Sequence, residues 1–579
     1  DMAQYPNPIS LLEVTDKTTS DRVLVNGYLQ AEPIKGLTLK ANLGVDRRYD
    51  KNKSYVPNTT VAGAAKGGIA NILQRDNIDY LMELTANYTK DFGNHSLTAL
   101  VGYSYQQFNQ ESVYAGNEDF STDGFLYNNL QAGAGTKPYV NSSARKSALG
   151  SYFARANYSY LGKYLLTVTV RADGESNFHP DYRWGYFPSV SAGWRFSDEE
   201  FMKPLSSILS NGKLRASYGQ TGNSNIGNYM TDSYGVVSGW VFGNDGYMGT
   251  AITKRGNKKL TWETTSEFNI GLDLGFFDNR ISLSMEYYNR IISDLLVSNK
   301  SLPAYNEINT IAANIGKTQG RGFELTLSTV NIMNKDWTWS TDFTFYTFKD
   351  NWYERDPNWK PAAYESKKDP IRSYYSYVSD GLLQVGEKAP AWQPTLVPGQ
   401  IKLKNLYDTG TSPNVLDQYD KVNLGSQDPK CTLGLNNTLR YKNLDFNIYF
   451  YGEIGRLRGA SYYDAWIVGL GNSLTNVSQQ SLHSYTNANQ NTTVPNLIES
   501  AYDFGDYYHK KINYLRCRNI TLGYTIPVSK SIANSVRISA NVSNPFVFTN
   551  WNGVDPETDT GNFSYPNVTS FSFGIDISF

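Results

Sequence analysis

The sequence predicts an all-β protein, a transmembrane antiparallel β-barrel with about 17 strands in this chain. Three observations predict this fold: strands with one apolar and one polar face, connectors that alternate between short and long, and a C-terminal strand that ends in Phe. The length of 579 residues suits several soluble domains or one very large barrel. No apolar run reaches the roughly 18 residues that a membrane-spanning helix needs. The mean hydropathy of -0.47 is compatible with a barrel, because the residues of its strands alternate in polarity.

The C-terminal strand carries the clearest pattern. From Phe571 to Phe579 every odd position is Phe or Ile, and every even position is Ser, Gly or Asp. A strict period of two is typical of a β-strand with one apolar face. A final strand of this kind that ends in Phe is how outer-membrane barrels finish.

The same period predicts the other strands. Their polar faces carry Asp and Glu repeatedly, which a dry core does not tolerate unpaired. A wet barrel interior accommodates these carboxylates, and so does the solvated face of a soluble sheet, so this signal leaves both open. The predicted strands are Arg22–Glu32, Leu37–Tyr49, Ile78–Lys90, Ser96–Phe108, Ala148–Tyr160, Tyr164–Ala172, Tyr186–Phe196, Leu214–Gly219, Thr261–Gly275, Ile281–Leu296, Gly320–Val330, Trp337–Phe348, Cys431–Tyr441, Leu444–Tyr451, Tyr514–Ile526 and Val536–Phe546.

Connector length alternates along the chain. Short turns such as Asp91–His95 and Asn331–Asp336 follow one end of the strands, and long connectors such as Asn109–Ser147 and Lys349–Lys430 follow the other. Short periplasmic turns and long external loops are typical of outer-membrane barrels. Soluble sandwiches give no reason for this alternation, and the absence of a fixed repeat weakens a propeller.

Strand parity predicts that the barrel is incomplete. When strand directions are counted back from the C-terminus, Arg22–Glu32 runs toward the periplasm. An intact bacterial barrel has an even number of strands and starts in the periplasm, so an odd number is expected to precede this chain. Residues 1–21 are then expected to form an extracellular loop segment, and residues 22–579 the barrel.

Several motifs resemble those of the SusC/RagA-type TonB-dependent transporters of Bacteroidetes. The resemblance covers nearly the whole chain, and Glu175 is a departure from the family pattern RxDGSSxF. The motifs are Asn7–Glu13, Arg171–Phe178, Arg183–Arg195 with the sequence RWGYFPSVSAGWR, Leu214–Asn223 with LRASYGQTGN, Trp262–Thr265, Asn269–Asp273, Tyr514–Arg516, Asn519–Tyr524, Asp555–Glu557, Tyr565–Pro566 and Phe571–Phe579.

The resemblance implies a barrel of about 22 strands with a globular plug and an N-terminal TonB box. This chain would hold strands 6 to 22, and would lack the plug, the TonB box and roughly five strands. The implied function is import of a large nutrient across the outer membrane, first an oligosaccharide and alternatively an oligopeptide. A SusD-like surface lipoprotein would cap the mouth, and TonB with ExbB and ExbD would supply energy through the absent segment. A siderophore or cobalamin transporter, a passive porin and a soluble carbohydrate-binding protein remain as alternatives.

Loop aromatics are the candidate substrate-binding residues. They lie in long external connectors, where an indole ring can stack on the apolar face of a sugar. The alternative is that these rings pack the loops or extend the outer aromatic girdle. The candidates are Trp240, Trp352, Trp359, Trp392 and Trp466.

The sequence predicts no enzyme, cofactor or metal site. Four scattered His residues lack ligand spacing, and no Ser/His/Asp set has a local signature. The resembling family often carries an acidic stretch where this chain has Asn405–Gly410; Asp408, Asp417 and Asp420 remain nearby, and a hydrogen-bonded acidic loop is expected there in preference to a calcium site. The net charge of -1 argues against nucleic acid as a partner.

Overall fold

The computed structural model describes residues 9–135, 138–242, 245–303, 305–306, 308–407, 414–459, 479–496, 503–528, 533–558 and 565–578. The chain divides into two compact units. The first comprises Asp1–Ala192, Gly219–Ser266 and Ser293–Ile315, and the second comprises Gly193–Tyr218, Glu267–Ile292 and Gly316–Phe579.

Seventeen strands belong to one sheet, and they correspond one for one to the strands predicted from the period-two pattern. The structure therefore confirms the all-β class and the number of strands. The strands are β1 (Thr15–Ile34), β2 (Leu37–Val56), β3 (Ile69–Phe92), β4 (His95–Glu118), β5 (Tyr139–Tyr160), β6 (Tyr164–Glu175), β7 (Trp184–Trp194), β8 (Leu209–Asn223), β11 (Glu263–Phe276), β12 (Ile281–Ser301), β13 (Thr310–Met333), β14 (Trp337–Glu354), β19 (Cys431–Tyr441), β20 (Leu444–Arg458), β21 (Lys510–Ile526), β22 (Ser535–Thr549) and β23 (Ser570–Ser578).

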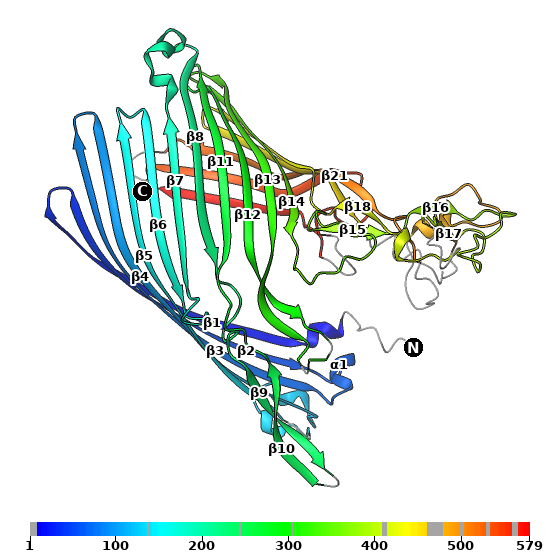
Figure 1. Ribbon diagram of the computed structural model, residues 1–579. Helices are drawn as coiled ribbons and strands as arrows, with labels where there is room; N and C mark the ends of the chain where they lie inside the picture. Colours follow the sequence, from blue (N-terminus) through cyan, green and yellow to red (C-terminus); the bar gives the residue numbers. More distant parts are fainter. Residues whose placement is uncertain are drawn as a thin grey trace. The chain divides into compact units, whose positions relative to one another are not determined.

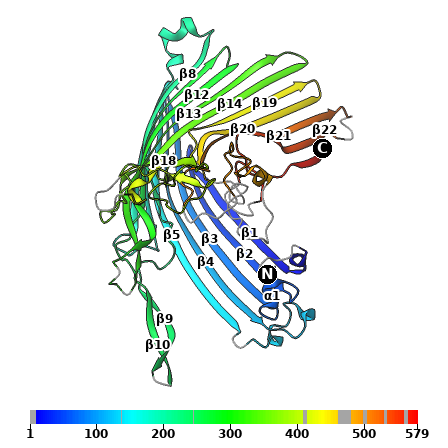
Figure 2. The ribbon, with the colours of Figure 1, turned by 90° about the vertical axis from the view of Figure 1, so that its right-hand side faces the viewer.

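In the first unit, β1 to β6 pair with their sequence neighbours in antiparallel order. Figure 1 shows these strands in blue to cyan, and Figure 2 shows β1 to β5 following one another. β3 and β4 have 24 residues each, more than twice the 9–11 residues that a tilted barrel strand needs to cross a bilayer. β1 begins at Thr15, within residues 1–21, for which the sequence predicts an extracellular loop segment.

In the second unit, β13, β14 and β19 to β23 form a second antiparallel series. The turn between β13 and β14 is short because the Asn334 side chain accepts hydrogen bonds from the backbone N–H groups of Asp336 and Trp337, at 3.1 and 2.9 Å. The other short turn named above, Asp91–His95, also separates two paired strands, β3 and β4. Short turns therefore mark one end of these hairpins and long connectors the other.

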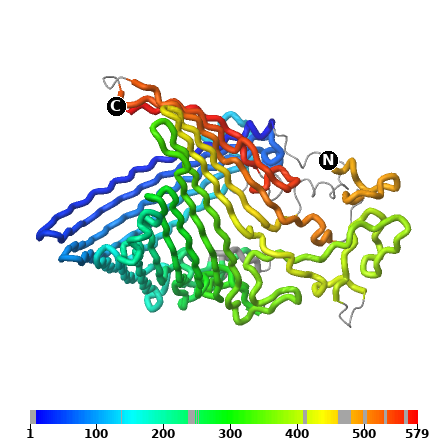
Figure 3. Tube along the Cα trace, turned by 90° about the horizontal axis from the view of Figure 1, so that it is seen from above, coloured from blue at the N-terminus to red at the C-terminus, as the bar shows by residue number. Residues whose placement is uncertain are grey.

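Long connectors hold the remaining elements. Within the second unit, Figure 3 shows the yellow-green segment extending beyond the ends of its strands. This segment contains β15 (Ser373–Ser376), β16 (Ser379–Leu382), β17 (Ile401–Leu403) and β18 (Val422–Ser426); the first unit has the hairpin of β9 (Tyr234–Phe242) and β10 (Asp245–Lys254). The helices are α1 (Val61–Ala64) and the 3-10 turns η2 (Ser10–Glu13), η3 (Asp123–Phe125), η4 (Leu130–Ala132), η5 (Phe196–Asp198), η6 (Glu200–Leu205), η7 (Gln418–Asp420) and η8 (Gln479–His483).

Clusters of buried apolar residues stabilise the connectors. In the first unit, Phe178, Phe187, Leu260 and Trp262 pack together at the end of the strands. In the second unit, Leu382, Leu403, Tyr485 and Tyr508 form the core of the outer segment, which we call the outer subdomain (residues 355–430 and 479–509 as far as described). Within the described residues, no helix is long and apolar enough to span a membrane.

Candidate functional site

The polar strand faces of the second unit carry networks of ion pairs and hydrogen bonds. Arg215 of β8 binds Asp273 of β11 at 3.0 Å and also contacts Glu286 of β12. The Ser284 hydroxyl donates to Asp273 at 2.7 Å, and Asn269 donates to Glu286 at 3.2 Å. These groups are partly exposed, so water can complete their hydrogen bonding.

The network continues along the other strands of this unit. Arg537 of β22 binds Asp445 of β20 at 2.6 Å. Asn447 donates to Asn436 at 2.8 Å, and Ser328 donates to Asp342 at 2.7 Å. The opposite faces are apolar, as Phe446 and Ile448 show beside Asp445 and Asn447. The sheet thus has one wall that suits water and polar solutes, and one that suits lipid.

The first unit has an equivalent polar wall. Arg22, Asp46, Arg48, Asp79 and Arg145 line a depression with a volume of about 520 Å³. Arg22 and Asp46 form an ion pair at 2.6 Å across β1 and β2. The opposite face is apolar and forms a shallow groove lined by Leu29, Leu39, Leu84 and Val101, among others.

A buried ionic cluster joins β21 to the connector that follows β22. Arg516 is 3 % exposed, and its guanidinium binds Asp555 at 2.9 Å and Glu557 at 2.5 Å. Arg518 binds the second oxygen of Glu557 at 2.5 Å. Asp555 also accepts hydrogen bonds from the backbone N–H groups of Glu557 and Asn567. Both Arg516 and Asp555 belong to motifs that the sequence analysis singled out, but their contact was not predicted.

Buried polar side chains hold the outer subdomain together. Gln393 is fully buried; its amide donates to the carbonyl of Ile401 at 3.4 Å and accepts from the N–H of Leu403 at 2.7 Å. Asp420 is also fully buried and accepts from the N–H groups of Leu406, Tyr407 and Asp417. Its carboxylate thus organises the loop at residues 406–407 and 417.

No group of three or more metal-ligating side chains occurs among the residues that the structure describes. Asp408, one of the three carboxylates considered for calcium, lies outside those residues. Asp417 caps the turn η7 by accepting from the N–H of Tyr419 at 2.8 Å. The acidic residues that are described therefore have structural partners within the chain.

Of the candidate tryptophans, the structure describes the side chains of Trp352, Trp359 and Trp392. Trp352 and Trp359 lie over the guanidinium of Arg355, with distances of 4.6 and 4.3 Å from the ring centroids to Cζ. Trp392 donates its indole N–H to the carbonyl of Leu403 at 2.7 Å, so it fastens the outer subdomain. Trp240 lies in β9, paired with Tyr247 of β10, and its side chain is not described. Trp466 lies outside the described residues.

His509 lies in the outer subdomain directly before β21. Its ring meets Tyr374 edge-on, with a centroid distance of 4.4 Å. Burial lowers the pKa of His509 below its usual value, and the nearby carboxylates of Asp506 and Asp503 act in the opposite direction. The folded segment therefore favours the neutral imidazole.

We expect the contact of His509 to weaken in mild acid. Because the folded pKa is lowered, protonation favours the open segment, and stability falls as the pH drops through the unfolded value of about 6.5. Hydrogen exchange of residues 373–376 and 505–512 should accelerate between pH 7.5 and 5.5, after correction for the intrinsic rate. His509→Phe keeps a ring against Tyr374 and should abolish the dependence. An equal acid response in this variant would contradict the assignment.

Comparisons with known proteins agree with this geometry. Residues 4–544 match the family described as TonB dependent receptor-like, beta-barrel. TonB-dependent receptor P3 of Formosa agariphila is 32% identical over 99% of this chain and 60% of its own length. TonB-dependent receptor SusC of Bacteroides thetaiotaomicron is 28% identical over 99% of this chain and 57% of its own length. The chain thus spans about 60% of the relatives that it matches.

Solved structures give the same result. A structure of the RagAB peptide transporter superposes with a TM-score of 0.85 and 25% identity, over 99% of this chain and 63% of the other. Proteins of this family are transporters and receptors and not enzymes, and TonB-dependent barrels sit in the outer membrane. The two-faced strands, the alternating turns and these matches together show that the chain belongs to the TonB-dependent receptor β-barrel family, with relatives of the SusC and RagA type.

Proposed function

We propose that this chain forms the barrel part of a TonB-dependent outer-membrane importer of the SusC/RagA type. The main support is the polar wall of paired Arg, Asp and Glu side chains, which suits a wet passage for a large polar solute. The match with relatives over 99% of the chain supports the transporter class. The plug and the TonB-contacting segment belong to sequence outside these 579 residues, and a SusD-like lipoprotein caps the mouth.

The proposed cargo is an oligosaccharide. Aromatic rings in the outer connectors offer flat apolar surfaces, and Asn and Asp side chains on the polar faces offer hydrogen bonds to hydroxyl groups. An oligopeptide is the second candidate, because a structure of a peptide transporter superposes at a TM-score of 0.85. Backbone groups of a peptide can use the same Asn, Asp and Arg side chains.

Uptake by a strain that lacks the full-length gene separates these cargoes. We expect loss of growth on oligosaccharides as the sole carbon source and normal growth on peptides. Growth on the oligosaccharide should return with the complete gene and should fail when a protonophore is present. Loss of growth on peptides with normal growth on oligosaccharides would identify an oligopeptide as the cargo. Normal growth on every large nutrient would contradict the importer.

The tryptophans at Arg355 give a test at residue level. Removing both rings with Trp352→Ala and Trp359→Ala should lower the apparent affinity for oligosaccharide about tenfold, since stacking contacts contribute about 0.5–1.5 kcal/mol. Trp337→Ala is the matched control, because its ring packs against Tyr441 in a tilted arrangement near the short turns. Binding of fluorescently labelled oligosaccharide to whole cells measures the effect. Equal affinities of the double variant and the control would exclude these two positions.

A further inference from the structure

A basic patch lies on the apolar face of the β13–β14 hairpin, at the end remote from its short turn. Arg321 of β13 is paired with Lys349 of β14. Directly paired residues of an antiparallel ladder project from the same face. On this same face Phe323 and Phe345 approach each other, with ring centroids 6.4 Å apart. The face therefore changes from aromatic to basic along the hairpin.

The position of the patch along the strand matches a membrane interface. Trp337 occupies the same face at the short-turn end, twelve positions before Lys349. That separation is roughly 40 Å along the strand, or about 30 Å across a bilayer when the strand tilts by about 40°. The hydrocarbon core is about 30 Å thick. If Trp337 lies at the periplasmic interface, Arg321 and Lys349 lie at the headgroups of the outer leaflet.

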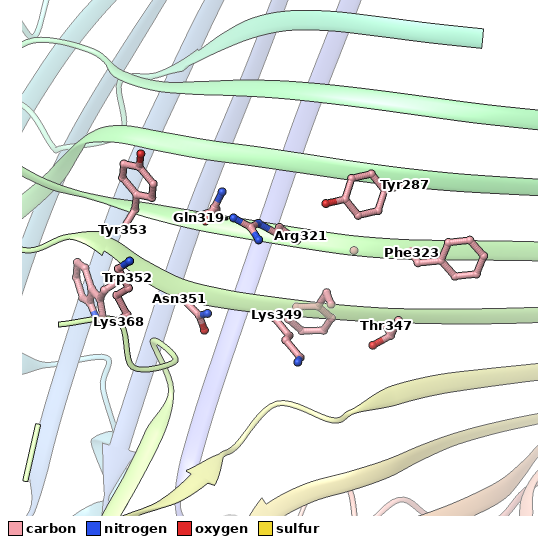
Figure 4. A pocket seen from close by; sticks show the side chains of 12 residues that line it. Tyr287, Gln319, Arg321, Phe323, Thr347, Lys349, Asn351, Trp352, Tyr353 and Lys368 are labelled. Atoms are coloured by element: carbon pink, nitrogen blue, oxygen red, sulfur yellow. Dashed lines mark hydrogen bonds between the residues drawn. The ribbon is translucent and has the colours of Figure 1, made fainter. Parts of the chain in front are cut away.

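An open cavity of about 530 Å³ lies at the patch (Figure 4). Three cations line it, namely Arg321, Lys349 and Lys368, together with Tyr287, Asn351, Trp352 and Tyr353. No Asp or Glu lines this cavity in the described part of the chain. The adjacent Asp350 belongs to the opposite face of β14, where it binds Arg290 at 3.2 Å. The charge of the cavity therefore complements a polyanion.

We propose that this cavity binds a phosphorylated glycolipid of the outer leaflet. Arg321 and Lys349 bind a phosphate group, since guanidinium and ammonium groups are the usual phosphate donors of proteins. Asn351 and the phenol groups of Tyr287 and Tyr353 are suited to sugar hydroxyls. Phe323 and Phe345 then meet the acyl chains. The inference rests on the outer-membrane location proposed above and assigns a lipid site to the outside of the barrel, at a cavity whose rim includes Trp352 of the pair at Arg355.

The test measures lipid retention by the complete protein in nanodiscs of neutral phospholipid. The probe is a diglucosamine lipid with two phosphate groups and four or more acyl chains, and native mass spectrometry counts the bound molecules. Arg321→Gln with Lys349→Gln should lower retention at least tenfold. Arg321→Lys with Lys349→Arg keeps both charges and should retain most of the lipid.

The control variant carries Lys335→Gln and Lys442→Gln, which remove two exposed charges from short turns at the other end of the strands. It should retain the lipid as the unchanged protein does. Equal retention by the two Gln variants overturns the site. Equal binding of the dephosphorylated lipid or of phosphatidylglycerol overturns glycolipid recognition, and complete competition by inorganic phosphate reduces the site to one for free anions.

Failure of this site is distinguishable from failure of the importer. Membrane fractionation and oligosaccharide uptake are measured on the same strains. A protein that reaches the outer membrane and imports its cargo without retaining the glycolipid overturns the lipid site alone. A protein absent from the outer membrane overturns the proposed function and the lipid site together.

Discussion

Replacing Arg516 by Met should destabilise the protein by about 3–5 kcal/mol, because it leaves the buried carboxylate of Asp555 without its counter-ion. Asp555 is 3 % exposed, and Arg516 binds it at 2.9 Å. Glu557 loses one of its two guanidinium partners and keeps Arg518. Urea denaturation in detergent, followed by tryptophan fluorescence, measures the loss. Hydrogen exchange of residues 550–558 should rise with it.

The matched control is Arg537→Met. Arg537 also binds a carboxylate, Asp445, at 2.6 Å, but its side chain is 32% exposed, so the expected loss is about 0–1 kcal/mol. Adding Asp555→Asn and Glu557→Gln to Arg516→Met removes the unpaired charges and should recover more than half of the loss. If Arg516→Met and Arg537→Met cost the same, the cluster at Arg516 is not a buried ionic site.

The ionic cluster at Arg516 connects two motifs that are far apart in the sequence. The motifs are Tyr514–Arg516 and Asp555–Glu557. Arg516 and Asp555 are 39 positions apart in the sequence, yet the guanidinium of Arg516 binds the carboxylate of Asp555. Their joint effect is to fix the connector after β22 against β21 at the end remote from the short turns. Sequence reasoning recognised both motifs by resemblance. It could not predict the ion pair, because a long-range contact leaves no periodic signal in the chain.

The strands were predictable because side-chain alternation is a local property. Within the part of the sheet that faces both lipid and water, each apolar residue is followed by a polar one, as in Leu444–Phe450. Strand ends were missed where this alternation disappears. β1 begins at Thr15 and β3 at Ile69, and the added residues are mainly polar on both faces. β9 was missed because its apolar residues do not alternate regularly with polar ones, and β15 to β18 were missed because strands of three to five residues are too short to show a period.

The candidate site was less predictable than the fold. Tryptophans in long connectors drew attention because of their composition, but the structure gives Trp392 a structural hydrogen bond and places Arg355 between Trp352 and Trp359. The basic patch at Arg321 and Lys349 lay inside predicted strands and was overlooked. Its signal was available, since Lys349 continues the odd-numbered apolar face of β14 beyond Phe345. A charged residue at the end of the apolar face of a barrel strand indicates the membrane interface.

Trp262→Ala should destabilise the first unit by about 3–5 kcal/mol, because it opens a cavity in a closely packed core. Trp262 is 7% exposed and contacts Phe178 and Phe187, with ring centroids 5.7 and 5.4 Å away. Its indole N–H donates to the carbonyl of Arg183 at 2.7 Å. The variant loses the packing and one of the two hydrogen bonds to that carbonyl, which also accepts from the N–H of Glu175 at 3.1 Å. Hydrogen exchange of residues 176–185 and 257–262 measures the local effect.

Trp262→Phe divides this loss into its two parts. The ring of Phe keeps contact with Phe187 but cannot donate to the Arg183 carbonyl, so about 1–2 kcal/mol should be lost with the hydrogen bond and the smaller ring. Trp337→Ala is the control, because its side chain is 42% exposed and its loss should remain below about 1 kcal/mol. From burial, the expected loss of stability is therefore largest for Trp262→Ala, smaller for Trp262→Phe and smallest for Trp337→Ala. An equal loss of stability in Trp262→Ala and Trp337→Ala would contradict this prediction. The core around Phe178 would then not hold the ends of β6, β7 and β11 together. The motif residues Trp262 and Phe178 would need a role in binding instead of packing.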